Sequence, residues 1–188
     1  GQEGAEVPRD YQARDEPGPV HEQAGIYLPY RPSRVIMQDA AVHPTPLVES
    51  VAMGSVAAPV PKARPLLPAN WQEGKLLSAA QCETLIYACE AFARDLPGQF
   101  RPSQQGTTVA LAEDGHFYRQ GFFLGDGTGA GKGRQIAGVM MDRWLPGERR
   151  HGSLTKNAAL LQDSRRAWEA LSGAAPRIQP PPRWKLRA

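Results

Sequence analysis

The 188-residue sequence has little cysteine, few aromatic residues and no long apolar run, and each shortage excludes a class of protein. No stretch of about 18 apolar residues occurs, so we expect neither a membrane span nor a membrane partner. The two cysteines, Cys82 and Cys89, lie in a helix-like stretch, about 10 Å apart along its axis and beyond disulfide reach. Four scattered histidines show no zinc-site spacing. These features exclude a secreted disulfide scaffold and disfavour a metalloprotein, and we predict a cytoplasmic location.

Proline and glycine are abundant instead, with 18 and 19 residues, about a fifth of the chain against roughly 12% in average usage. Eleven of the 18 prolines fall within residues 1–70. We therefore predict that residues 1–36 are disordered and that 37–70 form an extended, proline-rich segment. Within that segment a short helix should open at Thr45-Pro46 and run to Gly54. The net charge of +3 is too small to require a nucleic-acid partner.

From Trp71 onward the pattern is that of a folded unit, which we expect to span 71–175 and to be followed by a basic, proline-rich tail at 176–188. Ser78-Ala-Ala-Gln81 is a capping-box pattern and should begin a helix. The polar stretch Arg149–Leu154 is unlike a buried parallel strand and leaves a strand there in doubt. The elements expected in order are a helix over 79–94, a strand over 107–111, a turn at 114–115, a strand over 117–124, an amphipathic helix through 136–144 and a helix over 157–171.

The most informative segment is Gly125-Asp-Gly-Thr-Gly-Ala-Gly-Lys-Gly-Arg134, between the apolar Phe122-Phe-Leu124 and the amphipathic helix. A strand, a glycine loop, a lysine and a helix in this order form the P-loop arrangement. Glycines leave backbone N–H groups free to surround phosphate oxygens, and the positive end of the helix faces the same anion. Lys132 would supply an ammonium group for the β- and γ-phosphates.

The candidate nucleotide-binding residues of this loop are Gly127, Thr128, Gly129, Ala130, Gly131, Lys132, Gly133 and Arg134. Two positions depart from the G-x-x-x-x-G-K-[ST] pattern. Asp126 stands at the first glycine position, and Gly133 replaces the hydroxyl residue that normally holds Mg²⁺. Asp126 is either a substitute Mg²⁺ ligand or a turn residue facing solvent, and Arg134 either contacts phosphate or covers the first helical turn.

Two other interpretations of the loop stay open. It could be a flexible linker that happens to contain lysine. It could also be a dinucleotide loop, because Gly125, Gly127 and Ala130 fit G-x-G-x-x-[GA].

The segment Phe123–Arg134 resembles the nucleotide-binding motif of the strawberry notch family, helicase-like P-loop NTPases related to superfamily 2. The stretches 37–50, 77–88 and 160–168 also resemble bacterial members, and the resemblance covers about 35–186. It implies an α/β fold, an incomplete RecA-like core of parallel strands with flanking helices. It also implies ATP with Mg²⁺ as ligand, adenine recognition by Gln81, and a glycine at 133 as a family feature. Bacterial members are usually far longer and often carry a methyltransferase region.

A complete ATPase of this kind needs a carboxylate pair on a later strand. None of the four acids after Gly133, namely Asp142, Glu148, Asp163 and Glu169, follows an apolar strand. We therefore expect the ATP-binding N-terminal portion of a strawberry-notch-like helicase/ATPase, with no catalytic residue in this chain and no turnover by the chain alone. Its partners would be the rest of that polypeptide and, through it, nucleic acid.

Two alternatives to this function remain: a non-catalytic or degenerate interaction segment with a vestigial P-loop, and a fragment of a dinucleotide-binding enzyme. For residues 155–157 two roles also remain open. Thr155, Lys156 and Asn157 either contact a nucleic-acid backbone or serve only to let Asn157 cap the following helix.

Overall fold

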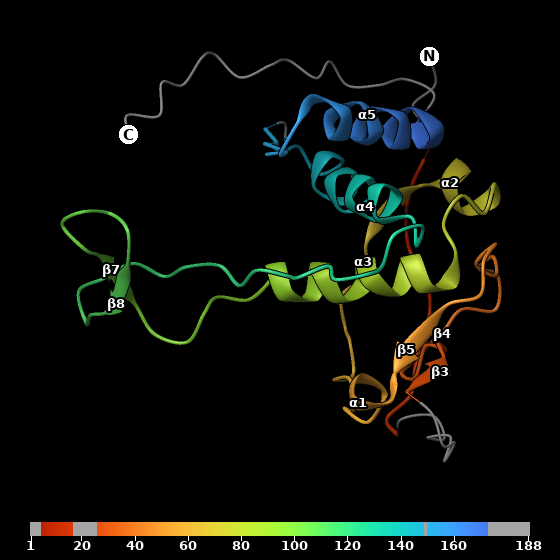
Figure 1. Cartoon of the computed structure of the whole chain (residues 1–188), viewed down its shortest axis with the longest axis horizontal. Helices are drawn as coiled ribbons and strands as arrows, with labels where there is room; N and C mark the ends of the chain where they lie inside the picture. The colour runs from red at the N-terminus through yellow and green to blue at the C-terminus, as the bar shows by residue number, and fades with distance from the viewer. Residues whose placement is uncertain (1–4, 17–25, 149, 173–188) are drawn as a thin grey trace.

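The computed structural model describes residues 5–16, 26–148 and 150–172 (Figure 1). Three helices form the body: α3 (Ala79–Phe92), α4 (Lys132–Trp144) and α5 (Ala158–Ser172). α4 packs against both α3 and α5. The strands β3 (Tyr27–Pro29), β4 (Val35–Ile36) and β5 (Val48–Ser50) lie on the other side of α3 (Figure 1). The hairpin of β7 (Phe100–Pro102) and β8 (Val109–Leu111) extends away from this body. None of the described helices is both long enough and apolar enough to cross a membrane.

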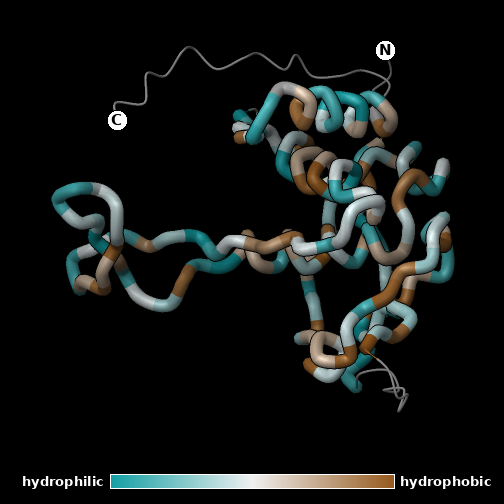
Figure 2. The backbone as a smooth tube through the Cα atoms, viewed as in Figure 1, coloured by the Kyte–Doolittle hydropathy of each residue, from teal (hydrophilic) through white to brown (hydrophobic). Residues whose placement is uncertain are grey.

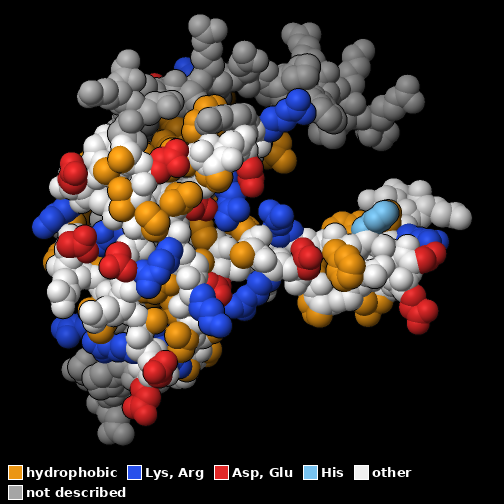
Figure 3. All heavy atoms as spheres, turned by 180° about the vertical axis from the view of Figure 1, so that it is seen from behind, with side chains coloured by type: hydrophobic (Ala, Val, Ile, Leu, Met, Phe, Trp, Pro, Cys, Tyr) orange, Lys and Arg blue, Asp and Glu red, His pale blue; other side chains and the backbone are white. Residues whose placement is uncertain are grey.

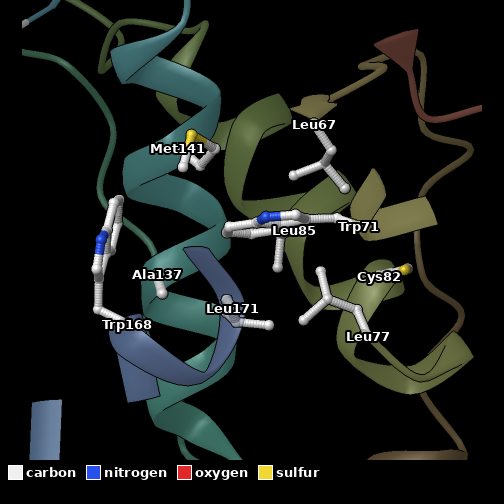
Figure 4. Packing of buried hydrophobic residues seen from close by; sticks show 9 residues of the cluster. All are labelled: Leu67, Trp71, Leu77, Cys82, Leu85, Ala137, Met141, Trp168 and Leu171. Atoms are coloured by element: carbon white, nitrogen blue, oxygen red, sulfur yellow. The ribbon is translucent and has the colours of Figure 1, made fainter. Parts of the chain in front are cut away.

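The main core lies where α3, α4 and α5 meet the segment formed by β6 (Leu66–Pro68) and α2 (Ala69–Glu73). Leu85 of α3 is fully buried at its centre, and a Cβ on Gly138 of α4 would lie 2.5 Å from the Leu85 side chain. The glycine therefore lets the two helices approach closely. Figure 2 shows the hydropathy of each residue along the backbone. In Figure 4 the side chains of Leu67, Trp71 and Leu85 face one another at the centre of the core. The core residues are Leu67, Trp71, Leu77, Cys82, Leu85, Ala137, Met141, Trp168 and Leu171.

The predicted capping box at the start of α3 is confirmed. The Gln81 N–H donates to Ser78 Oγ at 3.3 Å, and the Ser78 N–H donates to Gln81 Oε1 at 2.9 Å. At α5 the Leu160 N–H donates to Asn157 Oδ1 at 3.1 Å. Asn157 therefore caps this helix, which is one of the two roles considered for residues 155–157. Cys82 and Cys89 are both free, as their spacing predicted.

The strands of the described residues form four two-stranded antiparallel pairs, not a parallel sheet. The expected RecA-like core of parallel strands is therefore not seen in this part of the chain, and residues 150–154 form no strand. The pairs are β1 (Glu6–Pro8) with β6, β2 (Gln12–Ala13) with β4 (Val35–Ile36), β3 (Tyr27–Pro29) with β5 (Val48–Ser50), and β7 with β8.

The apolar segment before the glycine loop is also different from our prediction. Residues 117–124 form no strand and make only an isolated bridge, between Arg119 and Asp95. Phe123 is 91% exposed. The Leu96 N–H donates to Tyr118 O at 2.7 Å and the Gln120 N–H donates to Arg94 O at 2.8 Å, an antiparallel contact too short to make a strand. A buried parallel strand needs a longer run of hydrogen-bonding neighbours. The strand predicted over 107–111 is confirmed for its last three residues, which form β8.

The N-terminal segment is more ordered than its composition predicts. Strands β1 to β4 fall within 5–16 and 26–36, so the expectation of disorder is wrong for these residues. Tyr11 and Val35 are buried against Ile86, which is fully buried in α3. The composition of a segment cannot show that it will use the apolar face of a distant helix. The rest of the predicted disorder and the tail at 176–188 lie outside the described residues.

The short helix expected from Thr45-Pro46 is shifted. Residues 48–50 form β5, and α1 (Val51–Gly54) begins only after it. Ser50 is its N-cap, with Oγ accepting from the Met53 N–H at 3.2 Å. Pairing with β3 takes Val48, Glu49 and Ser50 into a strand, so the helix begins after Ser50 and not at Thr45.

Candidate nucleotide-binding site

The glycine loop, residues 125–131, runs into the first turn of α4 and adopts the backbone pattern of an anion-binding nest. Gly129 and Gly131 have φ of 86° and 80°, in the left-handed region. Among the described residues Lys75 is the one non-glycine with positive φ, so Thr128 and Ala130 alternate with the glycines at negative φ. In an anion-binding nest, alternation of this kind directs backbone N–H groups toward one point. In this loop the Ala130 N–H also donates to Gly127 O at 3.4 Å.

The start of α4 adds to this concentration of donors. Gly131 is the N-cap of α4 and provides no side-chain hydrogen bond, so no side-chain cap competes for the first N–H groups of the helix. A Cβ built on Gly127 or Gly129 would meet nothing within 4 Å. The loop therefore has open space beside it, as a phosphate group would require.

Lys132 is folded back across the loop. Its Nζ donates to the carbonyl oxygens of Asp126 at 2.6 Å and Gly127 at 3.0 Å. An ammonium group has three N–H bonds, so two hold the loop closed and one is left for a ligand. The arrangement places a positive charge beside the nest, and it fits the polyphosphate of a nucleotide.

The carbonyl oxygens at the end of the loop are held by the rest of the protein. Ala130 O accepts from His43 Nε2 at 3.1 Å, and from the side-chain amides of Gln81 and Gln135 at 3.5 Å each. Gly131 O accepts from Gln81 Nε2 at 3.3 Å. His43 was not among the sequence candidates; it lies only within the stretch 37–50 that resembles the strawberry notch family.

Residues 42–188 match the family model described as P-loop containing NTP hydrolase pore-1. The chain belongs to this P-loop family. It is 31% identical over 179 residues to Protein FORGETTER 1 of Arabidopsis thaliana, covering 95% of this chain and 12% of that protein. It is 29% identical over 143 residues to the strawberry notch homolog of Caenorhabditis elegans, covering 76% and 7%. To Protein strawberry notch of Drosophila melanogaster it is 29% identical over 159 residues, covering 83% and 8%.

These comparisons confirm that the chain resembles strawberry notch proteins; the bacterial type stays a prediction. The chain spans only about a tenth of the length of these relatives. No solved structure matches the chain.

In this P-loop family member Gln81 lies directly beneath the loop. The side chain is 6% exposed, its oxygen closes the capping box with Ser78, and its nitrogen reaches Gly131 O. A Cβ on Gly131 would lie 2.3 Å from Gln81 Nε2, so a glycine is needed here for contact as well as for φ. An adenine contact by Gln81 stays a prediction, and it would require the amide nitrogen to leave the loop.

The loop itself carries the carboxyl group of Asp126, and a second carboxyl group, that of Glu83, lies near it. Gln135 Nε2 donates to Asp126 Oδ2 at 3.0 Å, so Asp126 is held by α4. Burial, and then the nearby charge of Asp126, raise the pKa of Glu83 from 4.5 to about 7. No sequence pattern pointed to Glu83, because only the packing of α3 brings this residue close to Asp126. Among the described residues no three His, Cys, Asp or Glu side chains form a metal-binding group.

The structure explains why Gly133 carries no hydroxyl group. A Cβ at this position would lie 2.8 Å from Ala167 Cβ of α5, closer than carbon atoms can pack. Arg134 donates from Nη1 to Leu76 O at 2.9 Å and so ties α4 to the residues preceding α3. Thr128 is exposed in the loop. Of the predicted site residues, Gln81 and Lys132 therefore donate hydrogen bonds to carbonyl oxygens of the loop. One N–H donor of Arg134 is bound instead to Leu76 O, outside the loop.

Proposed function

We propose that this chain binds ATP, with the phosphates held by backbone N–H groups from Gly127 to Gly133 and by Lys132. The observation that carries the proposal is the nest of alternating left-handed glycines that leads into a helix without a side-chain cap. Membership of the P-loop family supports nucleotide as the anion. Thr128 and Arg134 would lie at the edge of the phosphate site, and Gln81 on the side of the base.

Mg²⁺ would enter with the nucleotide and neutralise part of the phosphate charge. Gly133 provides no ligand for it, so Asp126 is the one side chain of the loop itself that offers a carboxylate. Gln135 occupies Asp126 Oδ2 and leaves Oδ1 for a metal or a metal-bound water. If Asp126 has this role, Asp126→Asn weakens Mg²⁺-dependent ATP binding; if it only shapes the turn, the dependence on Mg²⁺ is unchanged.

In the complete protein we propose that ATP binding serves a helicase-like ATPase acting on nucleic acid. The support is the P-loop family and the resemblance to strawberry notch proteins. On the face shown in Figure 3, Lys and Arg side chains are interspersed with Asp and Glu side chains. A nucleic-acid partner is therefore proposed for the whole polypeptide and not for a surface of this chain. We expect no hydrolysis by this chain alone.

The test is calorimetric titration of the chain with MgATP, and of the Lys132→Ala variant. Loss of one charge-assisted contact should weaken binding by about 10- to 150-fold. Lys156→Ala removes an exposed lysine outside the loop and should bind as the wild type does. NAD⁺ in place of ATP separates nucleotide triphosphate binding from a dinucleotide site. A folded chain, shown by helical circular dichroism, that binds neither ligand would indicate a vestigial loop.

A further inference from the structure

His43 reaches the glycine loop from a segment 87 residues earlier in the chain. Its Nε2 lies 3.1 Å from Ala130 O, and a carbonyl oxygen only accepts, so Nε2 carries the proton. On the other side of the ring, Nδ1 lies 3.0 Å from both Thr45 O and Thr45 Oγ1 and 3.2 Å from the Thr45 backbone N. The imidazole is thus fixed at both nitrogens, between its own segment and the loop.

The segment that carries His43 is itself anchored beside the loop. The Ala79 N–H donates to Ala41 O at 2.8 Å, and Ala41 forms a bridge with Ser78 at the start of α3. Pro44 follows His43 directly and restricts its backbone to extended conformations. Few rotatable bonds of the backbone thus separate His43 from the anchored Ala41, so the place of His43 beside the loop is well defined.

The contact has a consequence for the anion-binding nest. In a trans peptide group the C=O and the following N–H point in opposite directions. A donor that holds Ala130 O against the body of the protein therefore turns the Gly131 N–H the other way, toward the outer side of the loop. Glycine tolerates φ of either sign, so without such an anchor the peptide group before Gly131 could rotate at little cost.

We propose that His43 is a positioning residue of the phosphate-binding loop, which holds the Ala130–Gly131 peptide group so that the Gly131 N–H faces a nucleotide phosphate. The inference rests on the proposed function. Of the three side chains that donate to Ala130 O, His43 makes the shortest contact, at 3.1 Å against 3.5 Å for each glutamine. Removal of His43 would leave only the two longer hydrogen bonds.

The first experiment measures MgATP affinity for His43→Ala and His43→Gln. The alanine variant should bind about 3- to 10-fold more weakly, as expected for one lost neutral hydrogen bond. The glutamine variant places an amide N–H close to the position of Nε2 and should stay within about twofold of the wild type. His116→Ala, at an exposed histidine that follows β8 and bridges Phe100 of β7, is the matched control and should leave the affinity unchanged.

The second experiment needs no nucleotide. Amide hydrogen exchange of residues 129–132 in the ligand-free protein should be faster in His43→Ala and unchanged in His43→Gln. Equal affinity and equal exchange in His43→Ala and the wild type would overturn the proposal, and so would a His43→Gln variant as impaired as His43→Ala. A wild type that does not bind MgATP would refute the proposed function, and the exchange data would then decide separately whether His43 positions the loop.

Discussion

Introducing a side chain at Gly133, where most P-loops carry a hydroxyl residue, should destabilise this chain. A Cβ at this position would lie 2.8 Å from Ala167 Cβ, so α5 must move away from α4 or both helices must distort. Overpacking of this kind costs about 1–3 kcal/mol, and replacing glycine in a helix returns at most about 1 kcal/mol. For Gly133→Ala we therefore expect a net loss of about 1–2 kcal/mol in the free energy of unfolding.

Urea denaturation followed by circular dichroism measures this loss. Ala167→Gly removes the opposing carbon, so the double variant should recover most of it, with a coupling of about 1–2 kcal/mol. Gly121→Ala is the matched control, because a Cβ there would meet nothing within 4 Å. Gly133→Ala as stable as the wild type, or additive with Ala167→Gly, would refute the argument. Gly133→Ser should likewise lose stability and gain no Mg²⁺-dependent ATP affinity.

Two further predictions concern the half-buried carboxyl group of Glu83 and the buried one of Asp142. The pKa of Glu83 is raised to about 7, so the fold favours its protonated form; this stability is fully present below about pH 4.5 and is lost as the pH rises through 7. Glu83→Gln should therefore be more stable than the wild type by about 1–3 kcal/mol at pH 8 and equal to it at pH 4, measured by urea unfolding at both pH values. Asp142 is buried and accepts from the Leu66 N–H at 2.7 Å and from Cys89 Sγ at 3.3 Å, so Asp142→Ala should cost about 2–4 kcal/mol in thermal or urea unfolding. Asp163→Ala, at an exposed position of α5, should change stability by less than about 0.5 kcal/mol, and a similar effect at Asp142 would contradict its role as the link between β6 and α4.

The features that the sequence determined by itself are local. The capping box of Ser78 and Gln81, the cap at Asn157 and the glycine pattern of the loop each involve residues within a few positions of one another. Hydrogen bonds over such short separations form wherever the right residues stand at the right spacing. The same holds for family membership, because the motif Phe123–Arg134 is contiguous in the chain.

The features that only the tertiary structure decided join distant segments. The strand expected at 117–124 is absent because a strand depends on neighbours that no local pattern specifies. Strands formed instead in the N-terminal segment, where α3 offers an apolar face. His43 beside Ala130, Glu83 near Asp126 and Ala167 against Gly133 are all contacts between distant parts of the chain. Packing of the helices sets these distances, and with them the orientation, charge and available space of the phosphate loop.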